Sequence, residues 1–194
     1  MDKVNLGIVK QSFTSVVWSH KIHEKCSEVL EKKNNKFKIW NIILVVLILI
    51  FTILQVKYSK YEYIWMISIV LTICEFILLL ITLTFSYWEL ADKHKQLAKS
   101  LLNIREEYLA LIWDIINDKI TNLELRRDNL KDKLEINYRY APNQVEWAYG
   151  LAVKSLWVNP NEQTWDYTYS DEEIDRFLPL ELKSTSIKIN KISE

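Results

Sequence analysis

The sequence predicts an all-α membrane protein organised around a two-transmembrane helical hairpin. Two stretches, 39–56 and 64–88, contain a single charged residue between them, Glu75. Each is long enough to cross the hydrocarbon core of a bilayer as a helix. Only two glycines and three prolines occur among the 194 residues, which favours long helices over sheets and tight turns. We expect an N-terminal helical arm before the hairpin, a long cytoplasmic helix continuing the second span, and a small helical C-terminal region.

The arm, residues 1–38, has a loose apolar helical face and many lysines close to the first span. His20, His23, Glu24 and Cys26 lie close together in it, but their spacing does not match a standard set of metal ligands. We interpret them as a polar helix face with two titratable histidines. No metal or other cofactor is expected. No disulfide is expected between Cys26 and Cys74, since one precedes the membrane and the other lies within it.

The short connection at 57–63 makes the two spans an antiparallel hairpin, with aromatic residues gathered at both ends as at two membrane interfaces. Lys and Arg counts predict the orientation. The 20 residues before Ile39 hold six, the connection holds two, and the 20 after Trp88 hold four. Both termini should therefore be cytoplasmic.

The second span carries polar side chains on one face. Five of them are spaced 4, 3, 7 and 4 residues apart: Ser68, Thr72, Glu75, Thr82 and Ser86. At about 100° per residue they occupy a sector roughly 80° wide. A carboxylate at bilayer depth is costly, so this face should turn towards other helices or water. We predict that the five residues line a pore; the alternative is that Glu75 only holds helices together.

An apolar seam continues beyond the second span on the expected long helix, 89–140. Its members recur at intervals of four and three residues: Leu90, His94, Leu97, Leu101, Ile104, Tyr108, Leu111 and Ile115. Such a heptad pattern predicts helix–helix contact but not whose helix is contacted. One interpretation is a seam between subunits, and the other is packing on the arm of the same chain. If 64–115 were one straight helix, the seam and the polar face would lie roughly 30° apart, which favours an inward-facing surface in a symmetric bundle.

The C-terminal region, 141–183, contains two capping-box patterns, Asn143 with Glu146 and Ser170 with Glu173. The first should open a helix containing Trp147, and the second a short helix that stops at Pro179. The acidic cluster at 171–175 is interpreted as helix capping rather than as a cation site. The tail, 184–194, is expected to be polar and frayed.

Catalytic chemistry is not apparent in the sequence. It has no Gly-rich phosphate loop, HExxH, CxxC or GxSxG motif. The formal net charge is zero, so bulk charge does not indicate direct nucleic-acid binding. We expect a protein that is not an enzyme.

Two stretches resemble the bacterial SLATT domains, the SMODS- and SLOG-associating two-transmembrane effectors. They are residues 85–115 and 140–182, with Ala91, His94, Tyr108, Leu111 and the sequence SDEEIDRFLP at 170–179 as the matching details. The resemblance implies a pore-forming effector of bacterial conflict systems, located in the bacterial inner membrane and controlled by a nucleotide signal or a neighbouring sensor protein. No recognisable sensor domain is fused here, so a separate partner is expected to supply the signal.

The function expected from these observations is an oligomeric effector that permeabilises the bilayer and arrests growth in an anti-phage or other conflict system. The main alternative is a membrane-anchored interaction module that conducts no ions. A small proton-coupled transporter is a further alternative, although one hairpin rarely forms an alternating-access core.

Overall fold

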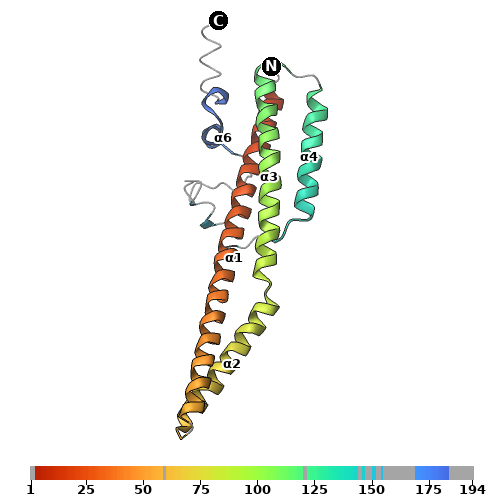
Figure 1. Cartoon of the computed structure of the whole chain (residues 1–194). Helices are drawn as coiled ribbons and strands as arrows, with labels where there is room; N and C mark the ends of the chain where they lie inside the picture. The colour runs from red at the N-terminus through yellow and green to blue at the C-terminus, as the bar shows by residue number, and fades with distance from the viewer. Residues whose placement is uncertain are drawn as a thin grey trace. The chain divides into compact units, whose positions relative to one another are not determined.

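The computed structural model describes residues 3–58, 60–119, 122–143 and 169–183, together with positions 146, 150, 151 and 154. Within these residues all regular structure is helical (Figure 1). The elements are α1 (Lys3–Lys57), α2 (Glu62–Thr84), α3 (Tyr87–Ile116), α4 (Leu123–Arg139), α6 (Asp171–Phe177) and the 3-10 helix η2 (Leu180–Leu182). Two of the helices are long and apolar enough to cross a membrane. The all-α fold with two apolar helices is therefore confirmed.

The arm and the first span form one helix, α1, of 55 residues. Nothing in its sequence interrupts the backbone hydrogen bonds, because it contains no proline and its one glycine, Gly7, lies near the start. The chain leaves α1 after Lys57 and begins α2 at Glu62, so the connection is shorter than the segment 57–63 expected from the sequence.

The second span does not run straight into the next helix, which corrects the expected continuation. Phe85 has φ −104° and ψ 91°, outside the helical region, and α3 starts at Tyr87. Thr82 and Thr84 donate their hydroxyls to the carbonyls of residues 79 and 80, a competition with the main chain that bends helices. The carbonyl of Ser86, a residue type favoured at helix starts, then accepts the amide of Leu90. The straight helix assumed over 64–115 is thus wrong.

The helix expected over 89–140 is also divided, into α3 and α4. Asp118 and Asn122 have φ values of 51° and 67° in the left-handed region. Asp and Asn visit this region more readily than other non-glycine residues because their short side chains can hydrogen-bond locally. The backbone at Asp118 and Asn122 therefore departs from the helix between α3 and α4, and α4 folds back along α3 (Figure 1).

The chain divides into two compact units. The first contains residues 1–26 and 93–194, and the second contains residues 27–92. The core of the first unit is formed by the start of α1, by α3 and α4, and by the C-terminal segment. Its buried apolar residues include Phe13, Val16, Leu101, Leu111, Leu130, Ile174, Leu178 and Leu182.

The C-terminal segment is fastened to the start of α1 by side-chain to main-chain hydrogen bonds. The Gln11 amide donates to the Tyr169 carbonyl over 2.7 Å, and its carbonyl oxygen accepts the Tyr169 amide over 2.9 Å. Lys10 is buried, and its Nζ donates to the Leu182 carbonyl over 3.2 Å. The predicted capping box of Ser170 and Glu173 is confirmed at the start of α6.

Gln11→Ala is expected to destabilise the first unit by about 2 kcal/mol, because two main-chain groups of Tyr169 lose their partner. Chemical denaturation in mild detergent measures the loss, and hydrogen exchange should show faster exchange across 169–182. Asn103→Ala, at an exposed position of α3, is the matched control and should change stability little. Equal stability of the two variants would contradict the role given to Gln11.

Three predictions on the C-terminal region fall largely outside the described residues. These are the capping box at Asn143, the helix containing Trp147, and the frayed tail 184–194. They stay predictions.

Candidate functional site: the membrane hairpin and its buried glutamate

Within the second unit, the end of α1 and the whole of α2 run antiparallel and face each other along a regular seam (Figure 1). The less exposed residues recur at intervals of three and four on both helices. On α1 they include Asn34, Phe37, Asn41, Leu44, Ile48, Phe51 and Gln55; on α2 they include Ile64, Ser68, Leu71, Glu75, Leu78 and Thr82. We call this set the hairpin seam. Its spacing is that of paired helices packed side by side.

The other faces of both hairpin helices expose large apolar side chains. Examples are Ile42, Leu49 and Ile53 on α1, and Val70 and Phe76 on α2, all between 58% and 68% exposed. An apolar surface of this extent is unfavourable in water and is expected of a helix facing lipid. The second unit is therefore a membrane-spanning hairpin.

Glu75 is the one charged residue of the hairpin seam. It is 8% exposed, and its Oε2 is buried without a hydrogen-bond partner among the described residues. Buried polar atoms are nearly always hydrogen-bonded, because burying one without a partner costs free energy. Glu75 therefore occupies a site in which its carboxyl group is poorly satisfied.

The other predicted pore-lining residues are placed differently. Ser68 and Thr82 are half-buried in the hairpin seam, whereas Thr72 and Ser86 are exposed. The hydroxyls of Ser68, Thr72 and Thr82 donate to main-chain carbonyls of their own helix, over 3.2, 2.8 and 2.9 Å. The structure thus brings Ser68, Glu75 and Thr82 against the first span and leaves Thr72 and Ser86 outside. Their role in a pore stays a prediction.

Cations and aromatic rings meet at the end of the hairpin seam that lies near the start of α3. Lys33 Nζ lies 4.5 Å from the centre of the Tyr87 ring, and Lys38 Nζ lies 5.5 Å from that of Trp88. Phe37 stacks on Tyr87 with ring centres 5.6 Å apart. Such groups are typical of the interfacial layer, where lysine charges reach water while aromatic rings sit among headgroups.

The predicted seam on α3 is occupied by the chain's own helices. Leu90 is half-buried, and the seven members from His94 to Ile115 are buried, with at most 7% of any side chain exposed. The apolar members pack in one core with Phe13, Val16 and Val17 of α1. Packing on the arm of the same chain, the second interpretation of the pattern, therefore accounts for the seam.

A buried histidine pair joins α1 to α3 in the first unit. The Nδ1 atoms of His23 and His94 are 2.7 Å apart, and the two side chains are 1% and 0% exposed. Two neutral imidazoles satisfy this contact when one donates its Nδ1–H and the other accepts. Burial, with His94 adding to it, lowers the pKa of His23 to about 4, and burial also lowers the pKa of His94.

The pairing could not be predicted from the sequence, because no local pattern connects positions 71 residues apart. His20 does not join the pair, although burial lowers its pKa too. Among the described residues, no group of three or more His, Cys, Asp or Glu side chains is arranged to hold a metal ion.

Comparison with protein families identifies the chain. The model of the SMODS and SLOG-associating 2TM effector domain family 4 matches residues 6–173. The chain belongs to this SLATT family. Comparisons with curated proteins and with solved structures return no match.

The SLATT match extends from the start of α1 into α6 and so includes both apolar helices. The two transmembrane segments of the family description correspond to the hairpin formed by α1 and α2. The resemblance noted at residues 85–115 and 140–182 is thereby confirmed, and the chain is a two-transmembrane effector domain.

Proposed function

We propose that this SLATT protein assembles in the bacterial inner membrane and, when triggered, permeabilises it, with Glu75 as the group exposed to water and ions on opening. The observation that carries the proposal is the buried Glu75 carboxyl in the hairpin seam, whose Oε2 has no partner among the described residues. Ionisable residues at bilayer depth commonly mark ion or substrate pathways because their cost must be repaid by function.

An unsatisfied carboxyl favours a second arrangement of the hairpin. In the packed hairpin the group is held away from water among apolar neighbours such as Leu71 and Leu78. Water entering beside α2 would hydrogen-bond the carboxyl group, and so part of the cost of opening would be recovered. In an assembly of several copies, the Glu75 carboxylates would form a ring around the opening, and this ring would attract cations.

We expect assembly through the exposed apolar faces of the hairpin, since the seam on α3 is covered by the chain itself. Cys74 offers a probe, because it is exposed on α2 beside Glu75, whereas Cys26 is buried. Mild oxidation of membranes should yield a cross-linked dimer in wild type and in Cys26→Ser, but not in Cys74→Ser. Wild-type protein that stays monomeric after oxidation, under conditions in which it arrests growth, would argue against assembly through this face of α2.

Both termini are proposed to be cytoplasmic, on the lysine and arginine counts given above. A reporter active only outside the cytoplasm should be active when fused after Ser59 and inactive when fused after Glu194. The reverse result would refute the orientation. We further propose that a separate sensor or nucleotide-signal protein triggers the effector, since the family description links it to SMODS and SLOG proteins.

The direct test is entry of an impermeant dye and loss of membrane potential after induced expression. Wild type should admit dye before lysis, at a rate that rises with expression. Intact membranes at full expression, in cells that carry the neighbouring genes and have been triggered, would refute permeabilisation.

A second candidate is a membrane-anchored interaction module. One observation in its favour is the well-packed first unit, whose core includes the apolar seam of α3. Another is that the hydroxyls of Ser68 and Thr72 in the second span donate to carbonyls of their own helix. Under this proposal the first unit recruits a partner, growth arrest needs no dye entry, and a soluble form of the first unit competes with the full chain.

A further inference from the structure

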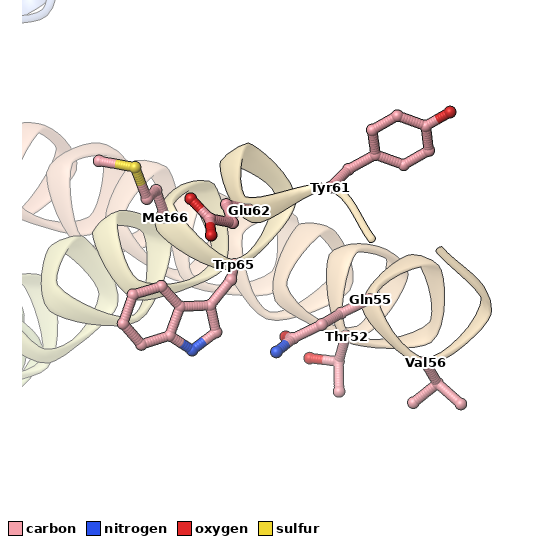
Figure 2. Close-up of a pocket in the computed structure, with 7 residues that line it drawn as sticks. All are labelled: Thr52, Gln55, Val56, Tyr61, Glu62, Trp65 and Met66. Carbon is pink, nitrogen blue, oxygen red and sulfur yellow. The ribbon is translucent and has the colours of Figure 1, made fainter. Parts of the chain in front are cut away.

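The turn of the hairpin holds a pocket of about 800 Å³ between the end of α1 and the start of α2. It lies within the second unit. Its lining residues are Thr52, Gln55, Val56, Tyr61, Glu62, Trp65 and Met66 (Figure 2). In Figure 2 the indole of Trp65 and the side chains of Gln55 and Thr52 point into the space between the two helix ends.

The lining combines hydrogen-bond donors, a carboxylate and apolar groups. Trp65 supplies an indole N–H and Gln55 an amide NH₂, both donors. Glu62 supplies a carboxylate, which accepts hydrogen bonds and attracts cations. The Thr52 hydroxyl donates to the Ile48 carbonyl over 2.7 Å, so its oxygen remains available as an acceptor. Such a set suits a ligand that carries both a negative and a positive group.

The position of the pocket limits the molecules it can meet. It lies at the end of both apolar helices, where three tyrosines gather: the rings of Tyr58 and Tyr61 are 6.4 Å apart, and those of Tyr61 and Tyr63 are 5.5 Å apart. Tyrosine and tryptophan concentrate at the level of lipid headgroups. A lipid headgroup, held in the bilayer at high local concentration, is therefore the ligand with the readiest access.

We propose that this pocket binds the headgroup of a zwitterionic phospholipid with a primary amine, such as phosphatidylethanolamine. The ammonium would lie against the Glu62 carboxylate, and the phosphate would accept the N–H groups of Trp65 and Gln55. Lys57 and Lys60, the cations of the adjoining turn, add to the attraction for phosphate.

The carboxylate discriminates between headgroups. An ethanolamine ammonium donates hydrogen bonds to Glu62, whereas the quaternary ammonium of choline has no N–H to donate. A phosphatidylglycerol headgroup has no positive group and would be repelled by the same carboxylate. The order of preference should therefore be ethanolamine, then choline, then glycerol lipids.

The test uses the full chain, reconstituted in vesicles of equal parts phosphatidylethanolamine, phosphatidylcholine and phosphatidylglycerol and then extracted in mild detergent. Native mass spectrometry counts the lipids that remain bound. Wild type should retain ethanolamine lipid over choline lipid by about fivefold, the factor expected for one partly exposed charged contact. Glu62→Gln should bring the two lipids to equal retention, and Trp65→Leu should lower retention of both.

Trp40→Leu is the matched control, because Trp40 is an exposed interfacial tryptophan outside the pocket. It should keep the wild-type preference, and circular dichroism should show the same helix content for all variants. Equal retention of ethanolamine and choline lipids by wild type would overturn the proposal. So would an undiminished preference in Glu62→Gln. The assay requires only the membrane hairpin, so its outcome is separate from that of the conductance tests.

Discussion

Lowering the pH from 7.5 to 5 is expected to destabilise the first unit by about 2 kcal/mol through His23 alone, given its pKa of about 4 in the fold against 6.5 when unfolded. The folded chain favours the neutral imidazole, so the unfolded chain binds more protons below pH 6.5. The stabilisation is complete above that pH and is lost as the pH falls towards 4. Burial lowers the pKa of His94 and His20 as well, so both add in the same direction.

Denaturant unfolding in mild detergent, followed by circular dichroism at both pH values, measures this loss. His94→Leu should be less stable than wild type already at pH 7.5, because it leaves the His23 Nδ1 buried without its partner. Replacing both histidines with leucine removes both polar groups, so most of the stability should return and most of the pH dependence should vanish. His20→Gln should retain most of the pH dependence, because the His23–His94 pair stays intact. A double variant as sensitive to pH as wild type would refute the role of the pair.

The helices of this protein could be predicted from its sequence because their signals are local. A run of eighteen or more predominantly apolar residues defines each span, with Glu75 as the one charged residue in the two runs. The serine and glutamate of the capping box at Ser170 define the start of α6. The heptad pattern likewise predicted a packed face on α3.

Two kinds of feature could not be predicted from the sequence. The breaks between helices depend on small differences in free energy between local backbone conformations, and the partner of the α3 seam lies far away in the sequence. No glycine or proline marks the bends at Phe85 and Asp118; they arise where threonine hydroxyls compete with the main chain and where Asp and Asn adopt left-handed conformations. A heptad pattern also cannot specify which helix fills it, and here the chain's own arm does.

The candidate site was located by a single exception to the apolar pattern. Glu75 stood out because charge is so rare in 64–88, and the structure places it in the hairpin seam. The five polar residues of the predicted face do not share one environment in the structure. A helical wheel shows which residues lie on one face of a helix, but it does not show how much of that face a neighbouring helix covers. Thr72, one turn from Glu75, is exposed for this reason.

Glu75→Gln is expected to slow dye entry by about tenfold while leaving the hairpin and its assembly intact, which corresponds to a loss of about 1.4 kcal/mol from the conducting state. Glutamine keeps the size of the side chain and can still form hydrogen bonds, but it cannot present a carboxylate to passing ions. Cation selectivity in bilayer recordings should therefore fall together with toxicity. Glu75→Leu should insert at least as well as wild type, because it removes a buried polar group without a partner.

Phe76→Leu is the matched control, since Phe76 is the exposed neighbour of Glu75 on the lipid-facing side of α2. It should match wild type in dye entry, selectivity and cross-linking through Cys74. If Glu75 serves only to hold helices together, Glu75→Gln should preserve toxicity and selectivity in full, and Glu75→Leu should lose the cross-linked species. Equal cation selectivity in wild type and Glu75→Gln would exclude Glu75 from the conducting path, because a charge that lines a pore must act on the ions that pass it.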